Sequence, residues 1–304
     1  MPEQTSSAAL PAFTLAIASG KGGTGKTLLA TNISALCADV GERVALVDCD
    51  AEAPNDHLFG RYEGPRSTRV DSLFASVDTD ACSACGLCRD ACAYGAVRVL
   101  GSSALVFEEL CHGCGLCVDI CPENAITEMP KRIGEVSVRR SADFARLTLL
   151  TGTLDVGQVK TPAVIRAARD AAASVPADLI VLDAPPGVAC AAVAAVRGAD
   201  ALLLVTEPTA FGRHDLRLGL ELGRSLRLPM AVVVNRAGTG GDGIDELCDE
   251  FGVPVIARIP FDRRIAEVYA RGGLAAAEMP DVRQALSGIL DEMRKIATRE
   301  SVRR

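Results

Sequence analysis

Short aliphatic runs alternate with helical patterns along most of the chain. The aliphatic runs predict strands at residues 13–19, 43–49, 178–184, 201–207, 230–235 and 254–259. Helical patterns lie between them, most clearly at residues 26–40, 161–174 and 211–226. This alternation is typical of an α/β fold with a mostly parallel, doubly wound sheet and helices on both faces.

A final helical pattern covers residues 281–300. It places one apolar stripe along the helix, made of Val282, Leu286, Ile289, Met293 and Ile296. Such a stripe could bind a membrane surface or pack on its own domain. Acidic and basic residues are mixed on the polar face, which favours packing on the domain.

The alternation stops after Phe59 and resumes near Ile133. The intervening residues are rich in cysteine and poor in long aliphatic runs. An insertion into a loop of the larger domain explains this with the fewest assumptions. The sequence therefore predicts a first segment of the larger domain at residues 1–62, a small inserted α+β domain at 63–134, and a second segment of the larger domain at 135–304.

Composition and charge narrow the class of protein. The chain has 304 residues, of which 49% are hydrophobic, so it can bury a full core. No apolar run reaches the length of a membrane span and residues 1–13 lack the features of a secretory signal, so we expect a cytoplasmic protein and no membrane partner.

Acidic residues are concentrated in the cysteine-rich segment. Residues 71–130 hold nine acidic and two basic residues, a net charge of −7 that equals the net charge of the whole chain. This balance argues against nucleic acid as a partner and favours a basic protein surface docking on the segment. The alternative is a solvated acidic face without a partner.

The stretch GKGGTGKT at residues 20–27 matches the phosphate-loop pattern, and it follows a predicted strand and opens a predicted helix. Lys26 is expected to neutralise the β and γ phosphates, and Thr27 to offer its hydroxyl to magnesium. Backbone N–H groups of the loop are expected to hold the phosphates of ATP or ADP, at Gly20, Gly22, Gly23, Thr24 and Gly25.

Three carboxylates follow predicted strands. Asp183 ends the run 178–184, where a magnesium shell beside a phosphate loop needs an anion. Asp48 and Asp50 follow the run 43–49. We assign Asp48 to the magnesium site with Thr27 and Asp183, and Asp50 to orienting the attacking water.

These motifs together carry a resemblance. Lys21 in the phosphate loop, with VDCDAEAPN at 47–55 and DAPPG at 183–187, resembles the deviant P-loop ATPases of the MinD and ParA superfamily, which includes Mrp proteins and the nitrogenase iron protein. The resemblance implies magnesium-dependent ATP hydrolysis by a homodimer that sandwiches nucleotide, with Lys21 reaching the partner's phosphates. It also implies that Asn235 and Arg236, with the loop 259–262, contact adenine.

Eight cysteines in the insertion form the pattern C-x-x-C-x-x-C-x-x-x-C twice, at an offset of 29 residues. The pattern is typical of two [4Fe-4S] clusters of bacterial ferredoxin type, in which the fourth cysteine of each run binds the other cluster. Two structural zinc sites are the competing interpretation. The ligands would be Cys82, Cys85, Cys88 and Cys121 for cluster one, and Cys111, Cys114, Cys117 and Cys92 for cluster two.

The four other cysteines fall outside these runs. Cys37, Cys49 and Cys248 are expected to be small core residues. Cys190 lies seven residues after Asp183, an offset at which the nitrogenase iron protein carries a cluster ligand. Cys190 is therefore a candidate dimer-axis cysteine.

A MinD-like ATPase with an inserted two-cluster module resembles a recognised group of bacterial and archaeal proteins. Three functions remain open for it. The first is coupling of nucleotide-dependent dimerisation to electron transfer, and the second is ATP-dependent assembly or delivery of an iron-sulfur or other metal cofactor. The third is spatial organisation of the MinD kind, which leaves the cysteines unexplained. A glutamine-dependent amidotransferase would need a glutaminase domain for which the chain has no room.

Overall fold

The computed structural model describes residues 12–238 and 243–303, and these residues form two compact units. The first unit contains the chain up to Ser67, Val136–Thr153 and Ile165–Arg304. The second contains Thr68–Glu135 and also Leu154–Val164. The expected insertion, 63–134, thus overlaps the second unit but omits the short segment after residue 153. The prediction that residues 1–13 are no secretory signal concerns residues that lie largely outside the described part of the chain.

The first unit is built on a mostly parallel sheet, as predicted, with the strand order β11-β10-β9-β1-β8-β2-β7-β6-β3. Its seven strands from β11 to β7 are joined by parallel pairings. The strands are β1 Phe13–Ala18, β2 Val44–Asp48, β3 Tyr62–Val77, β6 Ile126–Ser141, β7 Leu147–Leu154, β8 Leu179–Asp183, β9 Ala201–Thr206, β10 Met230–Ala237 and β11 Val255–Pro260.

Three of these strands were missed by the sequence analysis. The run that forms β7 is aliphatic and was overlooked, whereas β3 and β6 are long strands of 16 residues that pass from one unit into the other. Most of β3 is exposed, so its sequence lacks the buried aliphatic run that identified the central strands. Exposure explains why the pattern gave no signal there.

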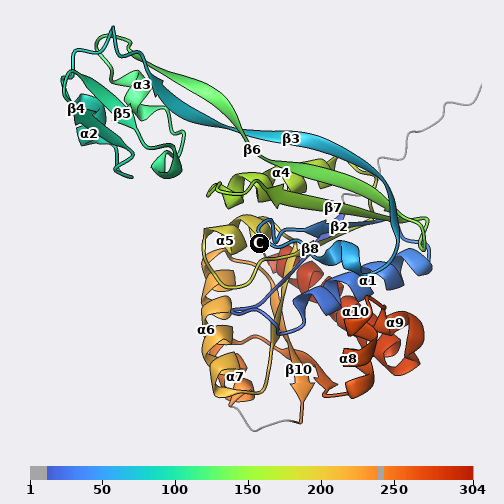
Figure 1. Cartoon of the computed structure of the whole chain (residues 1–304). Helices are drawn as coiled ribbons and strands as arrows, with labels where there is room; N and C mark the ends of the chain where they lie inside the picture. Colours follow the sequence, from blue (N-terminus) through green and yellow to red (C-terminus); the bar gives the residue numbers. More distant parts are fainter. Residues whose placement is uncertain (1–11, 239–242, 304) are drawn as a thin grey trace, which may run out of the picture. The chain divides into compact units, whose positions relative to one another are not determined.

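Helices cover both faces of the sheet, with α5, α6 and α7 on one side and α1, α8, α9 and α10 on the other (Figure 1). The helices are α1 Lys26–Asp39, α4 Thr161–Ala173, α5 Cys190–Val196, α6 Ala210–Ser225, α7 Ile244–Phe251, α8 Arg263–Ala270, α9 Ala275–Glu278 and α10 Pro280–Arg303, with the short η1 at Asp56–Leu58. None of the helices in the described ranges is long and apolar enough to cross a bilayer.

The C-terminal helix α10 packs on the core of its own unit, as predicted. Leu286, Ile289 and Met293 are buried, and Val282 and Ile296 pack against the same core. Cys37, Cys49 and Cys248 are buried as well, which confirms the interpretation of these cysteines as core residues.

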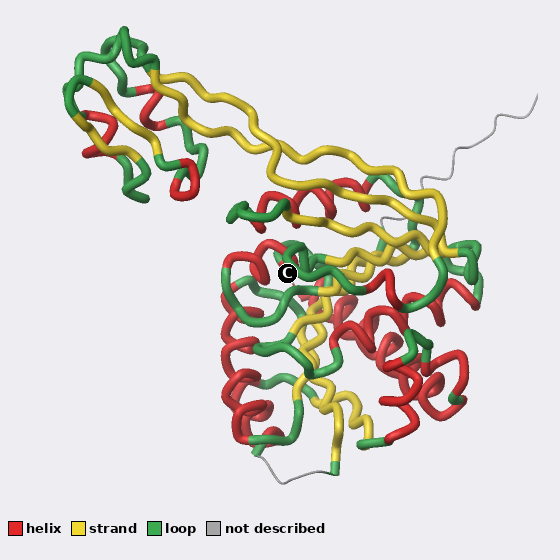
Figure 2. The backbone as a smooth tube through the Cα atoms, viewed as in Figure 1, coloured by secondary structure: helices red, strands yellow, loops and turns green. Residues whose placement is uncertain are grey.

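The second unit is small and contains a hairpin and short helices (Figure 2). Its two-stranded antiparallel sheet pairs β4, Val97–Leu100, with β5, Ser103–Val106. The helices are α2 Leu87–Ala91 and α3 Leu116–Asp119, and η2 covers Glu108–Leu110.

A buried amide connects α1 to α9 in the first unit. Asn32 is fully buried, and its side-chain oxygen accepts a hydrogen bond of 2.8 Å from the backbone N–H of Ala276. Its nitrogen donates to the carbonyl of Leu28 at 2.8 Å. Because α9 offers few side chains for packing, this amide fixes where the short helix sits.

Asn32→Ala should lower the free energy of unfolding by about 2 kcal/mol, because the buried N–H of Ala276 would lose its acceptor. Urea unfolding followed by circular dichroism measures the change. Ser34→Ala on the same helix is the matched control. The Ser34 hydroxyl is buried without a hydrogen-bond partner, so its removal should change stability by less than about 0.5 kcal/mol. Equal losses in both variants would contradict the assigned role of Asn32.

Candidate functional site

The loop between β1 and α1 forms one wall of a cavity of about 420 Å³ in the first unit. Gly25 caps α1 with φ of 102°, and a Cβ atom there would lie 2.4 Å from Nδ2 of Asn235. Only glycine fits this position, because the conformation is left-handed and the space is occupied. The loop therefore turns tightly onto the helix N-terminus, where backbone N–H groups and the helix dipole favour an anion.

Lys26 lies at the base of this loop and is 7% exposed. Its ammonium donates to Ser19 Oγ at 3.0 Å and to the carbonyl of Lys21 at 3.3 Å. Burial lowers the pKa of Lys26, while the carboxylates of Asp183 and Asp50 raise it. A phosphate in the cavity would give this desolvated cation a closer counter-charge.

Buried carboxylates meet at the carboxyl ends of β2 and β8. Asp48 is held by three backbone N–H groups, from Asp50 at 3.1 Å, Asn55 at 2.8 Å and Asp56 at 3.1 Å. Burial, and then the charge of Asp183, raise the pKa of Asp48 to about 7. Burial also raises the pKa of Asp183 to about 6. Without a bound cation, ionisation of both Asp48 and Asp183 is unfavourable, because two negative charges would then lie close together in a buried site.

Thr27 and Asp183 are brought together, as a shared magnesium site requires. Thr27 Oγ1 donates to Asp183 Oδ2 at 2.6 Å, while Asp183 Oδ1 is buried without a partner. Asp50 is half-buried and lines the cavity, and burial raises its pKa. Oxygen ligands of this kind are those that Mg²⁺ prefers.

Asp56 is a buried acid that the sequence analysis did not select. It begins η1, is fully buried, and neither carboxylate oxygen receives a hydrogen bond. Burial, followed by the charges of Asp48 and Asp183, raises the pKa of Asp56 well above its usual range. A proton held on Asp56 relieves its repulsion with the charges of Asp48 and Asp183.

Glu207 is a second functional candidate outside the predicted set. It follows β9, is nearly buried, and pairs with Lys21 at 3.2 Å and with Arg236 at 2.5 Å. The lysine that the resemblance assigns to a partner's phosphates is thus held within its own chain. A charged residue directly after a buried strand, at the same edge as Asp183, was the available signal.

Asn235 and Arg236 both line the cavity, together with Pro260 at the end of β11 and Phe261 and Asp262 after it. The Asn235 amide donates to the carbonyl of Thr24 at 2.8 Å, and its oxygen accepts from the N–H of Arg236. In this structure the amide therefore supports the phosphate loop.

Two further cavities lie in the second unit, and cysteines line both. Cys82, Cys85, Cys88 and Cys121 line one, whereas Cys92, Cys111, Cys114 and Cys117 line the other, with Cys88 also reaching it. These are the two quartets expected from the sequence. Across the described residues, no three His, Cys, Asp or Glu side chains converge on the position of a single metal ion.

The offset of 29 residues is repeated in the backbone of the second unit. Helices α2 and α3 begin at Leu87 and Leu116, each after a left-handed glycine. The N–H groups of Ala96 and Ala125 donate to Cys92 Sγ and Cys121 Sγ, both at 3.3 Å. Positive φ angles recur in pairs, at Ala84 and Gly113, Gly86 and Gly115, and Gly95 and Asn124.

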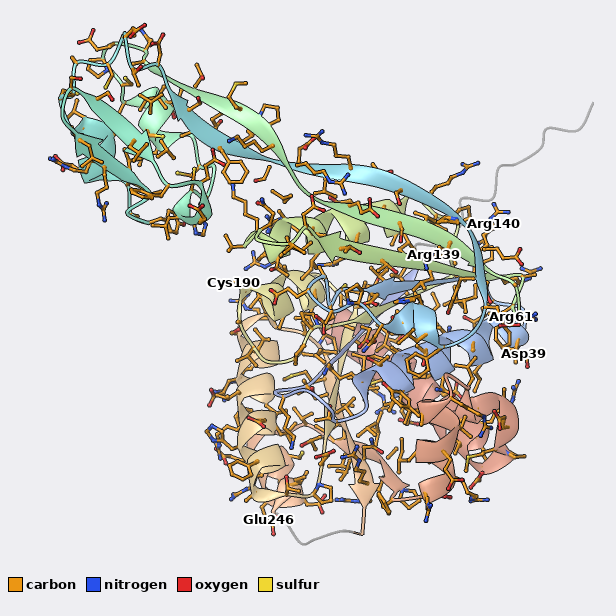
Figure 3. All side chains as sticks on the ribbon, viewed as in Figure 1. Asp39, Arg61, Arg139, Arg140, Cys190 and Glu246 are labelled. Atoms are coloured by element: carbon orange, nitrogen blue, oxygen red, sulfur yellow. The ribbon has the colours of Figure 1, made fainter. Side chains whose placement is uncertain are left out.

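Cys190, labelled in Figure 3, is exposed at the first residue of α5. The remaining predicted residues lie in the phosphate loop itself, where Gly22 and Gly23 line the cavity and Thr24 is buried. Gly20 is closely packed, because a Cβ there would lie 2.2 Å from the carbonyl of Asp215.

The sheet, the glycine-rich loop and the carboxylates at the strand ends define a nucleotide-binding protein of the P-loop class. The chain belongs to the family of CobQ/CobB/MinD/ParA nucleotide binding domains, whose model matches residues 15–275. It is therefore a nucleotide-binding ATPase of the MinD and ParA type.

Individual relatives are distant. An uncharacterized protein of Methanocaldococcus jannaschii is 29% identical over 258 residues, covering 85% of this chain and 89% of that protein. An iron-sulfur cluster carrier protein of Pseudomonas fragi is 26% identical over 287 residues, covering 88% of this chain and 79% of that one. The septum site-determining protein MinD from Pyrococcus horikoshii, solved with Mg-ADP, has a similar fold, with a TM-score of 0.59, 20% identity, and coverage of 95% of this chain and 98% of that chain.

The carboxylate cluster predicts how stability depends on pH in the nucleotide-free protein. The folded-state pKa values of Asp48 and Asp183 are raised from 3.8 to about 7 and about 6. Their contribution to stability is therefore fully present below pH 3.8 and is lost as pH rises through 6 to 7. Folded Asp56 keeps its proton at a pH where the unfolded chain has lost it, so Asp56→Asn removes this contribution and the melting temperature should fall less between pH 5 and pH 8 than in wild type.

Asp178→Asn is the control for this experiment. The Arg43 guanidinium lowers the pKa of Asp178 to about 2, so Asp178 is ionised at both pH values. Its loss should lower the melting temperature similarly at pH 5 and pH 8. An unchanged pH slope in Asp56→Asn would show that Asp56 is not coupled to the cluster.

Proposed function

We propose that this protein couples ATP-dependent dimerisation to electron transfer through two [4Fe-4S] clusters, to or from a partner protein. The observation that carries the proposal is the presence, in one chain, of a phosphate-loop cavity and two cavities that are lined by the eight thiols of the insertion. In this proposal the clusters are permanent cofactors of the inserted domain at residues 63–134.

At the nucleotide, the roles follow the contacts of the first unit. Lys26 would exchange its bond to Ser19 for the phosphates of ATP. Thr27 and Asp183 would hold Mg²⁺, with Asp48 beside them, and Asp50 would orient the attacking water. Lys21 would leave Glu207 and reach the nucleotide of a second copy, so the homodimer forms only when that contact repays the lost ion pair.

In the second unit, the thiol sets suit a polynuclear cluster. Thiolates are the ligands of iron-sulfur clusters, and the backbone N–H groups of Ala96 and Ala125 already point at two of the sulfurs. A bound [4Fe-4S] cluster would supply one-electron chemistry. The segment's net charge of −7 would attract a basic docking face on the redox partner.

A second candidate function is ATP-dependent assembly or delivery of an iron-sulfur cofactor. The relative named as an iron-sulfur cluster carrier protein favours it. The small number of exposed cysteines argues against it. Cys190 is the one cysteine of the described first unit that is not buried, so a bridging site there would need Cys190 of a second copy as well. Transfer of iron and sulfide to an apo-acceptor would support assembly, whereas retention of both would support electron transfer.

The coupling is tested by anaerobic redox titration of the reconstituted protein, followed by electron paramagnetic resonance. A non-hydrolysable ATP analogue with magnesium should shift at least one reduction potential relative to Mg-ADP, since the two nucleotides hold different dimer populations. Lys21→Ala should abolish both the nucleotide-dependent dimer and this shift. Lys295→Ala, which removes an exposed lysine, is the matched control and should retain both.

Two results would reject the coupling. The first is wild-type potentials that are the same with either nucleotide. The second is a dimer of Lys21→Ala that still forms with the ATP analogue. Iron, sulfide and zinc analysis of the same samples separates the cluster proposal from the zinc alternative.

Gly113→Ala should remove the cluster bound by the second quartet. A Cβ at Gly113 would lie 2.2 Å from the carbonyl of Leu73, and its φ of 62° is left-handed. The turn between Cys111 and Cys114 must therefore shift, so iron content should fall by about half, from about eight atoms to about four. Ala84→Gly, at the repeat-related position, is the control and should keep all of the iron. Full iron content in Gly113→Ala would contradict this assignment.

A further inference from the structure

The two cysteine-lined cavities are related by the same 29-residue offset as the sequence. Residues that line the first cavity have counterparts at that offset which line the second, including Ser83 and His112, Leu87 and Leu116, Pro122 and Ala93, and Ile126 and Val97. Carboxylates differ at two such pairs, since exposed Glu123 of the first cavity corresponds to Tyr94 in the second, and the other pair places a carboxylate with a buried oxygen in the second cavity. Val99 lines the first cavity, and Glu128 occupies its place in the second.

The Glu128 carboxylate has an unusual setting for a surface domain. Its Oε1 atom is buried and has no hydrogen-bond partner. Oε2 lies against the turn between Cys114 and Cys117, 3.7 Å from the position that a Cβ of Gly115 would take. A desolvated carboxylate at this wall would act on a cluster with little screening from water.

A lysine outside the lining of this cavity contacts the strand residues that precede its lining residue Ala75. The Lys160 ammonium donates to Ser72 Oγ at 3.0 Å and to the Leu73 carbonyl at 2.9 Å, and it lies 3.6 Å from the centre of the Phe74 ring. The Leu73 carbonyl is also the atom against which Gly113 packs.

The charges around Lys160 include those of the second quartet. Partial burial lowers the pKa of Lys160, and the charges of the Cys111 thiolate and of Glu128 raise it. Lys160 belongs to Leu154–Val164, the short segment that joins the second unit from outside the insertion. Among the described residues that line the first cavity there is no lysine, the Val99 position has no carboxylate, and the one carboxylate, Glu123, is exposed.

We propose that Glu128 and Lys160 set the reduction potential of the cluster held by Cys92, Cys111, Cys114 and Cys117 apart from that of the other cluster. This inference rests on the proposed function, because it requires both clusters. Reduction adds one negative charge to a cluster, which a carboxylate disfavours and an ammonium favours. Glu128 lines the cavity and Lys160 does not, so the second cluster has the lower potential and the first accepts an electron first.

The test is a redox titration of the full-length reconstituted protein with dithionite, followed by electron paramagnetic resonance. The signal missing from Gly113→Ala identifies the second cluster. Glu128→Gln should raise the potential of that cluster, and Lys160→Met should lower it, while the first cluster changes less in both variants. Glu123→Gln is the matched control, since Glu123 lines the first cavity but is exposed.

Each outcome is informative. Wild-type protein that reconstitutes without two clusters would overturn the proposed function itself. If both clusters are intact but their potentials do not change in Glu128→Gln and Lys160→Met, the inference alone is overturned. It is also overturned if Glu123→Gln changes the potential of the second cluster as much as these two substitutions do. Loss of the second cluster from Glu128→Gln would also overturn it, because Glu128 would then hold the cluster and not tune it.

Discussion

Repulsion among Asp48, Asp56 and Asp183 governs the nucleotide half of the molecule. Parallel strands deliver their carboxyl ends to one edge of the sheet, so β2 and β8 bring two of these acids together, and η1 adds the third. Water is excluded from all three, which favours their protonated forms. In the proposed function, a magnesium ion would permit full ionisation, so binding of the cation and release of protons would be linked.

The two lysines of the phosphate loop also carry like charges that lie close together. Lys26 and Lys21 both lie in the phosphate loop, and each is held by a partner in the chain itself, Lys26 by Ser19 and Lys21 by Glu207. Partners of this kind keep two cations in a small space before phosphate arrives. Both contacts are replaceable, because a triphosphate offers more negative charge than a hydroxyl or a single carboxylate. In the proposed function, Lys26 and Lys21 would therefore exchange their contacts with Ser19 and Glu207 for contacts with phosphate.

The sequence was most informative where local pattern and chemistry coincide. Central strands are continuous aliphatic runs, the phosphate loop is a contiguous motif, and the cysteines have a fixed spacing, so each could be recognised without contacts. Asp56 could not, because a fully buried acid has no periodic signature and depends on Asp48 and Asp183 folding beside it. Membership of Lys160 in the second unit also has no local signal, since it rests on a contact with Ser72, 88 residues away.

Strands β3 and β6 both pass from the first unit into the second, and β3 begins shortly after the carboxylates of the nucleotide site. Asp56 opens η1, and β3 begins at Tyr62 and continues into the second unit. The start of β3 is fixed by Arg61, whose N–H and guanidinium bind Asp143, while its carbonyl accepts the N–H of Ala142 just after β6. Both strands that carry the second unit are thus attached, at one point, to a segment that begins with the nucleotide-site carboxylates. The bonds between Arg61, Ala142 and Asp143 therefore join the start of β3 to the end of β6 within the first unit, so these two strand ends are held together.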